Sequence, residues 1–390
     1  MQYQTAGESH GLMLSAIVED VPAGLAIDQE VINADLQRRQ HSYGRGMRQV
    51  IEKDQVKITS GIRFGKTTGS PIALHIKNRD AENWKELMST FGDIPESFSP
   101  EVTPRPGHAD LVGALKQNAF DCRDIFERSS ARETAIRVAA AGIAREFLAE
   151  IGVDIQSYVT QIGSVVYEEE NPYMRAGIYA PLEIELSEVR CPHVETSEKM
   201  KKEIDKAREA GDSLGGKFRV VATGLIPGLG TYAQTHDRLQ ASIAQALFSI
   251  PAVKGVEFGL GFASADHPGS QVHDPISLRN GKFVRTSNNA GGLEAGMTTG
   301  MPLVITVAMK PIPTLQKPLS TINLDTLALA KASRERSDVC AVPNCAVVAE
   351  AELAFVLVRA YQKQFGAGCI ADVRANIQQY EKRLELRAQK

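Results

Sequence analysis

Apolar residues recur at helical spacing in four segments of the chain. The predicted helices cover residues 28–40, 129–152, 238–250 and 344–366. The second opens with a capping box, Ser130-x-x-Glu133, and closes on Gly152. The fourth is apolar on most of its faces, so we expect it to lie deep between other layers.

Segments rich in β-branched residues lie between these helices. The predicted strands cover residues 56–62, 70–78, 217–225 and 301–310. Strands and long helices follow one another without a regular strand–helix–strand rhythm, which favours an α+β fold over a doubly wound sheet. Two helices each lead into a Gly-Val pair and a β-like stretch, at 149–159 and 252–262, which hints at an internal duplication.

One domain accounts for the whole chain, residues 1–390, in this interpretation. The stretch 159–216 is the most polar, and we interpret it as a peripheral strand-and-helix excursion. The hydrophobic fraction of 43% and the charged fraction of 23% are those of an ordinary soluble globular protein. A net charge of −3 argues against bulk attraction to nucleic acid or membranes.

Targeting and metal signals are not found in the sequence. No apolar run approaches the roughly 18 residues of a membrane span, and the N-terminus lacks the pattern of a signal peptide. The five cysteines have neither CxxC nor Cys/His metal spacing. We therefore expect reduced thiols in a cytoplasmic enzyme without a metal site.

Arginines concentrate in loops that also hold glycines and hydroxyl groups. These blocks cover residues 38–49, 105–110, 127–134, 288–292, 310–314 and 334–338. Guanidinium groups match the geometry of carboxylates and phosphates. A solvated basic face making surface ion pairs is the plain alternative. The accompanying glycines and hydroxyls favour a small polyanionic ligand, whereas no basic amphipathic helix or interleaved aromatic set supports DNA binding.

Further candidate chemistry lies at a helix start and in two glycine loops. Ser129 and Ser130 open the predicted helix 129–152, where free N–H groups favour an anion, although Ser130 could simply be the cap. His10 in GESHG, residues 7–11, and His108 each lie beside a glycine and could act as general acids. Alone, GESHG more often marks a solvated turn histidine. Neither GxGxxG nor a P-loop occurs.

Taken together and in order, these blocks resemble those of the chorismate synthases. The shared strings are GESHG, TTGSPI, RPGHAD, ERSSARETAIRVA, SIPAVKGVEFGLGF, NNAGGLE, KPIPT and ERSDVCAVP. The resemblance covers nearly the whole chain and is weakest in 159–216. RSSARETA and ERSDVCAVP are long and unusual, which makes coincidence negligible.

This resemblance implies an activity, a cofactor and a fold. 5-Enolpyruvylshikimate 3-phosphate would lose phosphate and a ring proton by 1,4-anti elimination, giving chorismate in the last step of the shikimate pathway. The family requires reduced FMN although the reaction is redox-neutral. It also implies long helices sandwiched between antiparallel β-sheets, and a homotetramer. The chain has no identifiable insertion of the bifunctional members, so we expect an external flavin reductase, with NADPH only as an indirect reductant.

The resemblance also assigns roles to residues. His10 would protonate or stabilise the departing phosphate, His108 would hold or protonate the reduced flavin, and Asp338 would relay the ring proton through the flavin. The residues expected to face the substrate or the flavin phosphate are Arg39, Arg45, Arg48, Arg105, Arg132 and Arg336, of which Arg39 and Arg45 are alternatively NADPH contacts. The expected FMN contacts are Arg128, Ser129, Ser130, Pro251, Ala252, Ala295, Lys310, Pro311, Ile312, Pro313, Thr314 and Arg336.

Two departures and three alternatives qualify this assignment. Pro251-Ala252 stands where the family often has Asn-Ala, and Ala295 replaces a usual glycine, adding a methyl where backbone approach is close. Asp338 could instead pair with Arg336 or a neighbouring arginine and only shape its loop. An FMN-dependent oxidoreductase would differ by net consumption of NAD(P)H. An RNA-binding protein using the arginine loops would show binding that depends on RNA length.

Overall fold

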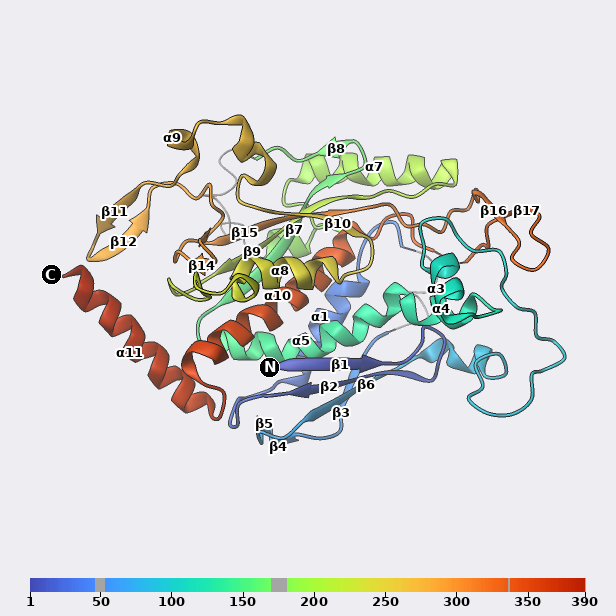
Figure 1. The fold of residues 1–390 in the computed structure, drawn as a ribbon, viewed down its shortest axis with the longest axis horizontal. Helices are drawn as coiled ribbons and strands as arrows, with labels where there is room; N and C mark the ends of the chain where they lie inside the picture. The colour runs from blue at the N-terminus through green and yellow to red at the C-terminus, as the bar shows by residue number, and fades with distance from the viewer. Residues whose placement is uncertain (46–52, 170–180, 336, 390) are drawn as a thin grey trace.

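Two antiparallel sheets flank a layer of long helices in the computed structural model, which describes residues 1–45, 53–169, 181–335 and 337–389 (Figure 1). The first sheet has the strand order β1-β2-β6-β3. Its strands are β1 (Gln2–Ala6), β2 (Met13–Glu19), β3 (Val56–Ile58) and β6 (Ile72–Lys77). Alternate residues of β6 are buried, because successive side chains of a strand point to opposite faces and one face covers the helices.

The second sheet lies on the other side of the helices and has the order β10-β15-β9-β7-β8. Its strands are β7 (Asp154–Ile162), β8 (Val165–Val166), β9 (Gly216–Thr223), β10 (Val253–Phe258) and β15 (Leu303–Met309). Long runs of these strands are buried, including Phe218, Val220 and Ile305. Mixed helix and sheet content with antiparallel pairing agrees with the α+β prediction.

The helical layer is built by α1 (Gln29–Gln40), α5 (Thr134–Glu150), α8 (Leu239–Phe248) and α10 (Val342–Phe365). α5 packs on the first sheet, α10 packs on the second, and the two helices pack on each other. α10 is buried along most of its length, as its apolar composition predicts. Close packing of α1 on α5 requires Gly142, because a Cβ there would lie 2.6 Å from Ile32 Cγ1.

The two halves of the chain repeat one topology. The first half runs β1-β2-α1-β3-β6-α5 and the second runs β7-β9-α8-β10-β15-α10, apart from inserted short elements. Taken from its other edge and without β8, the second sheet has the order β7-β9-β15-β10, which matches the order β1-β2-β6-β3 of the first sheet. This correspondence pairs α5 with α10 and α1 with α8. The sequence hint related α5 to α8 instead, because a similar Gly-Val stretch follows each of these two helices.

The remaining elements are short or lie at the periphery. α4 (Arg123–Ser129), η2 (Ala131–Glu133) and η1 (Arg79–Trp84) border the site described below. α7 (Val194–Ala210), inside the polar stretch 159–216, buries Met200 and Ile204 against the main core. The others are β4 (Ile62–Arg63), β5 (Lys66–Thr67), α3 (Asp110–Gln117), α6 (Pro181–Glu185), η3 (Thr235–Asp237), η4 (Gly261–Asp266), α9 (Gly269–Val272), β11 (Ile276–Arg279), β12 (Lys282–Arg285), β13 (Leu293–Glu294), β14 (Met297–Thr298), β16 (Ser320–Ile322), β17 (Leu329–Lys331) and α11 (Ile370–Ala388).

Two predicted elements are interrupted in the structure. The helix predicted over 129–152 is broken at Ser130, whose extended backbone separates α4 from η2 and α5. Ser130 Oγ accepts a hydrogen bond from the backbone N–H of Arg132, and the backbone N–H of Glu133 donates to the Ser130 carbonyl oxygen. The side chain of Glu133 bonds to Thr5 and Arg137 and does not complete the capping box. The strand predicted over 56–62 is split at Gly61, which has φ +79°.

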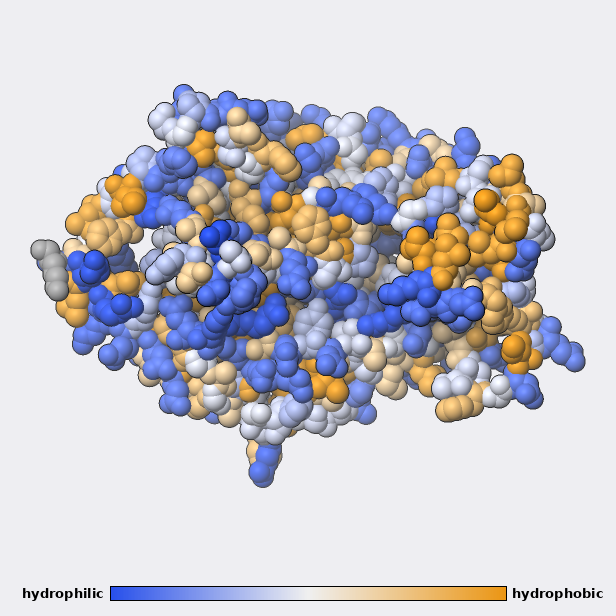
Figure 2. Space-filling model, viewed as in Figure 1, coloured by the Kyte–Doolittle hydropathy of each residue, from blue (hydrophilic) through white to orange (hydrophobic). Residues whose placement is uncertain are grey.

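Large apolar side chains are exposed at one end of the molecule. They gather over α3 and the β16–β17 hairpin, at the right of Figure 2. The exposed residues there are Leu111, Val112, Leu115, Phe120, Leu319, Ile322, Leu327 and Leu329. None of the helices that the structure describes is long and apolar enough to cross a membrane.

Candidate active site

A cavity of about 620 Å³ lies where the two halves of the chain meet. Its wall is formed by the β1–β2 loop, the α4–η2–α5 segment, the end of α1, the start of α10 and the loop after β15. Most of the residues that the sequence assigns to a site line this one cavity. These are His10, Arg39, Arg45, Arg105, His108, Arg128, Ser129, Ser130, Arg132, Pro251, Ala252, Lys310, Ile312, Pro313, Thr314 and Asp338.

Among the residues that the structure describes, two predicted site residues, Pro311 and Ala295, are not on the cavity wall. Arg48 and Arg336 lie outside the described residues. Pro311 belongs to the loop after β15 but does not line the cavity. Ala295 lies in the turn between β13 and β14, also away from the cavity lining, so this chain's own fold does not bring it to the expected flavin site.

His10 is buried in the loop that follows β1. Its ring nitrogen Nδ1 lies 2.7 Å from Glu127 Oε1, and its backbone N–H donates to Glu127 Oε2 at 2.8 Å. The ring also packs against Trp84, with 4.0 Å between the centroids and the planes tilted by 31°. The turn before it needs Gly7, because a Cβ there would lie 2.4 Å from the Met13 carbonyl oxygen. His10 is therefore an anchored cavity residue and not a solvated turn histidine.

His108 shares a buried carboxylate with Arg105. Asp110, at the start of α3, contacts His108 Nδ1 and accepts from Arg105 Nε at 2.7 Å. Arg105 also donates to Thr314 Oγ1 at 3.1 Å and stacks on Phe126. Burial opposes the charge of Asp110, yet the hydrogen bonds from His108 and Arg105 hold the pKa of Asp110 well below its usual range.

Arg39 and Arg132 converge on a second buried carboxylate. Arg132 Nη1 donates to Asp54 Oδ2 at 2.6 Å, and Arg39 Nη1 lies 3.8 Å from the same oxygen. Asn78 Oδ1 accepts two further bonds from Arg132. Arg39 also donates to Thr134 Oγ1 at 3.0 Å. The two cations are thus held rigidly at the cavity wall by groups behind them.

Asp338 is paired with Arg45 in this structure. Arg45 Nε lies 3.2 Å from Asp338 Oδ2, and both side chains are partly exposed to the cavity. An arginine pair was one of the two alternatives that the sequence left open for Asp338. A role as a proton acceptor remains compatible with this geometry because the pair is not buried away from the ligand space.

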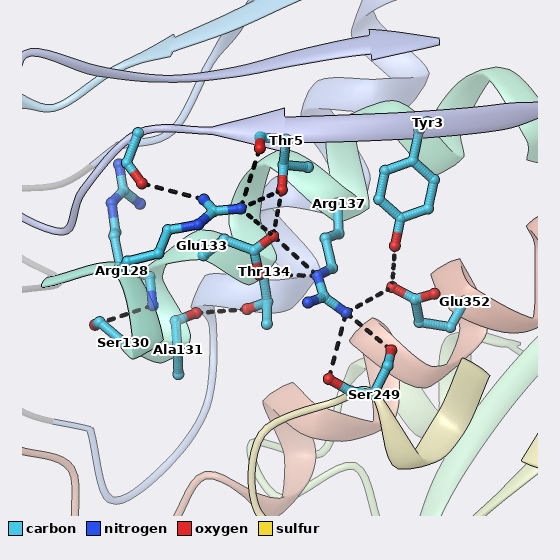
Figure 3. Close-up of polar contacts among 12 residues, drawn as sticks. Tyr3, Thr5, Arg128, Ser130, Ala131, Glu133, Thr134, Arg137, Ser249 and Glu352 are labelled. Atoms are coloured by element: carbon cyan, nitrogen blue, oxygen red, sulfur yellow. Dashed lines mark hydrogen bonds and ion pairs between the residues drawn. The ribbon is translucent and has the colours of Figure 1, made fainter. Parts of the chain in front are cut away.

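Arg128 and Arg137 both lie against Glu133 and make further contacts of their own (Figure 3). Arg128 turns toward β1, where it donates to Thr5 Oγ1 at 2.7 Å and to two backbone carbonyls. Arg137 binds Glu133 and Glu352 and reaches the carbonyl and hydroxyl of Ser249, just before the turn at 250–252. Arg137 therefore links α5 and α10 to a loop that the sequence assigns to the flavin.

Cations outnumber carboxylates around the cavity. Seven described cationic side chains line it, Arg39, Arg45, Arg105, Arg128, Arg132, Arg137 and Lys310, against three carboxylates, Glu133, Glu335 and Asp338. The pKa of Lys310 is lowered by burial and by the nearby charge of Lys254. Asp54, Asp110 and Glu352 pair with three of these arginines from behind the wall, so it is the guanidinium groups facing the cavity, and not its net charge, that favour an anionic ligand with more than one charged group.

Several residues of the site carry no role in the sequence analysis. Asp54, Glu127 and Asp110 anchor the predicted arginines and histidines, while Trp84 and Arg137 line the cavity. Only weak signals mark them: Trp84 is the chain's single tryptophan, and Glu127 and Asp110 belong to the arginine blocks. Their partners are distant in sequence or depend on the turn geometry.

Comparisons with known proteins identify the family. The model of the chorismate synthase family matches residues 1–362. This chain belongs to the chorismate synthase family. A chorismate synthase from Aquifex aeolicus is 49% identical over 97% of both chains, and one from Rubrobacter xylanophilus is 48% identical over 100% of this chain and 98% of its own. A crystal structure of a chorismate synthase superposes with a TM-score of 0.80 at 40% identity, covering 98% of each chain.

Membership of the chorismate synthase family confirms the resemblance found in the sequence. It also confirms the activity that the resemblance implied, the 1,4-anti elimination of phosphate from 5-enolpyruvylshikimate 3-phosphate to give chorismate. The enzyme class is a carbon–oxygen lyase of aromatic amino-acid biosynthesis. The family uses reduced flavin.

Proposed function

We propose that the 620 Å³ cavity is where this chorismate synthase family member binds its substrate beside reduced FMN. The observation that carries this proposal is the convergence of seven cations with His10, His108 and Asp338 on one cavity. The substrate has one phosphate and two carboxylates. Its charge therefore matches the sign and the multiplicity of the cationic lining.

The lining residues fit a flavin. Ile312, Pro313 and Val348 supply apolar surface for a flat ring, and hydroxyl and guanidinium groups border it. Ser129 Oγ is buried without a hydrogen-bond partner within the described part of the chain, and a phosphate or ring oxygen would satisfy it. We infer that Ser129, Ser130, Ala252 and the 310–314 loop hold the cofactor, as the resemblance implies.

Each residue then has a defined task. When bound, reduced FMN would supply the electron density that the elimination requires at the substrate. His10 donates a proton or hydrogen bond to the departing phosphate, and His108 binds near the flavin. Asp338 receives the ring proton at a carboxylate oxygen. Arg39, Arg45, Arg105 and Arg132 orient the anionic groups, and Arg48 and Arg336 are assigned to the same set from the sequence alone.

Other parts of the prediction belong to this proposal as well. NADPH acts only as an indirect reductant, through an external flavin reductase, and contacts at Arg39 and Arg45 are the alternative. The chain forms a homotetramer in the cytoplasm. The exposed apolar side chains of α3 and the β16–β17 hairpin support contact between copies, because such patches are unusual on monomers. The repeated topology of the two halves supports an origin by internal duplication.

Anaerobic turnover tests the proposed site. The protein with dithionite-reduced FMN should release phosphate and chorismate in equal amounts, without net consumption of NAD(P)H. His10→Ala should lower kcat by about 10²-fold or more, the usual effect of a lost general acid, while FMN still binds. His236→Ala, at an exposed position away from the cavity, is the matched control. Unchanged turnover in the His10 variant would remove His10 from the mechanism.

A further inference from the structure

Glu127 lies behind His10 and contacts it at two points. The carboxylate is buried, with 2% of the residue exposed. Oε2 accepts the backbone N–H of His10, and Oε1 lies 2.7 Å from its ring nitrogen Nδ1. The backbone carbonyl of Glu127 also accepts the N–H of Ser9 at 2.9 Å. One residue of α4 therefore determines both the path of the loop and the orientation of the imidazole.

The contact with Glu127 decides which nitrogen of His10 carries the proton. An ionised carboxylate can only accept hydrogen bonds, so Nδ1 must be the donor. Burial opposes ionisation, but the hydrogen bonds from His10 and the charge of Arg123 hold the pKa of Glu127 below its usual value. Nε2 is then the ring nitrogen left for a ligand, and no side chain in the described part of the chain binds it.

The surroundings restrict the ring further. Trp84 of η1 packs against it at a tilt of 31°, and Arg123 of α4 lies over Trp84 and donates to Glu127 Oε1 at 3.2 Å. Arg123 thereby stabilises the carboxylate without contacting the imidazole. The ring cannot rotate without losing both the contact with Trp84 and the bond from Nδ1. A carboxylate that fixes a histidine in this way stabilises the protonated ring and aims its second nitrogen.

We propose that Glu127 is a positioning residue for the reaction, acting through His10: it accepts the hydrogen bond from Nδ1–H and thereby stabilises the protonated ring, whose Nε2–H faces the departing phosphate. This inference rests on the proposed role of His10. It assigns a function to a buried carboxylate that otherwise has only structural contacts. Glu127 itself does not contact the ligand space, since it is absent from the cavity lining.

Glu127→Gln separates positioning from packing. Glutamine has nearly the same shape but offers one oxygen and one NH₂ group. If the oxygen continues to accept the backbone N–H of His10, the NH₂ group faces Nδ1, which must then be unprotonated, so the ring loses the protonated form that donates a proton from Nε2. We expect kcat to fall by about 10²-fold, as for a lost general acid, with KM and FMN affinity changed less than about 3-fold. Added to His10→Ala, the same substitution should cause little further loss.

Nitrogen NMR of ¹⁵N-histidine-labelled protein reads the proton position without requiring turnover. The wild type should show a proton on Nδ1 of His10, assigned by the loss of this signal in His10→Ala, and Glu127→Gln should show Nδ1 without a proton. Glu352→Gln is the matched control. Glu352 is also a buried carboxylate, it is not part of the cavity lining, and it pairs with Arg137 and Tyr3. It should leave the His10 signal unchanged.

The outcomes separate the inference from the function on which it rests. A wild-type protein that fails to make chorismate would refute the proposed function, while the NMR measurement would still test the His10–Glu127 contact. An active wild type without a proton on Nδ1 of His10 would overturn the inference even if Glu127→Gln does not fold. So would a Glu127→Gln variant with unchanged kcat, or one that costs a further 10²-fold in the His10→Ala background.

Discussion

Glu350 offers the sharpest test of how buried charge stabilises this fold. It lies in the middle of α10, fully buried, at the junction of the helical layer with the second sheet. It accepts hydrogen bonds from Arg38 Nη2 and Arg145 Nη1, each at 2.9 Å, and from Ser157 Oγ at 2.6 Å. Arg190 Nη2 approaches it at 3.4 Å. Replacing Glu350 by glutamine leaves these three arginines without their common carboxylate.

The magnitude follows from the pKa of Glu350. Burial alone would raise it, but the charges of Arg38, Arg145 and Arg190 lower the pKa from 4.5 to about 2. At about 1.4 kcal/mol per pKa unit, this difference corresponds to about 3 kcal/mol of stabilisation of the charged form in the folded state. Loss of one partner from a buried ion pair typically costs about 3–5 kcal/mol. Glutamine keeps one acceptor oxygen, so we expect a loss near 3 kcal/mol.

The loss should depend on pH with a definite sign. The pKa of Glu350 is lower in the folded than in the unfolded protein, so its contribution is fully present above about pH 4.5. It is lost as the pH falls toward about 2. The difference in stability between the wild type and Glu350→Gln should therefore be constant near neutral pH and shrink in acid.

Urea unfolding followed by circular dichroism measures this difference at neutral pH and again at about pH 3. Glu185→Gln is the matched control. Glu185 pairs with Arg38 and Arg190 at the edge of the same network, but its side chain is 34% exposed, so we expect a loss of about 1 kcal/mol or less. A Glu350 variant as stable as the wild type, or a loss that persists undiminished in acid, would refute the reasoning.

Three further predictions concern the site and one strained turn. Asp338→Asn should keep the fold and both ligands but slow the removal of the ring proton. With substrate deuterated at the carbon that loses this proton, single-turnover kinetics should show a larger isotope effect than in the wild type. An unaltered isotope effect with weaker substrate binding would indicate that Asp338 only forms a structural pair with Arg45. Asp54→Asn should lower stability by about 3 kcal/mol, because it leaves Arg132 without its buried carboxylate, and thermal unfolding that matches the wild type would contradict this. Ala295→Gly should be neutral or stabilising by up to about 1 kcal/mol, because Ala295 has φ +50°, and a clear loss in urea unfolding would show that its methyl group packs usefully.

Local sequence signals were sufficient for α1, α8 and α10, but the sequence analysis did not predict α11. Asp28 caps α1, with its side chain accepting the N–H of Glu30, and α10 is buried along most of its length. Capping and apolar composition are properties of a few consecutive residues, so they can be read before the fold is known. The break at Ser130 escaped this reasoning. Glu133, which was expected to complete a capping box, is engaged by Thr5 and Arg137, which lie outside that turn.

The sequence alone determined the family, the types of residue at the site and the sign of the ligand's charge. Those depend on motifs such as RSSARETA and on the concentration of arginines in glycine loops. Only the tertiary structure decided which of these cations are already neutralised and by which carboxylates. Asp54 lies 78 residues from Arg132, and His10 lies 117 residues from Glu127. Contacts at such separations depend on how both sheets close on the helices, since ion pairs and tautomers are set by distances of a few ångströms that no local pattern encodes.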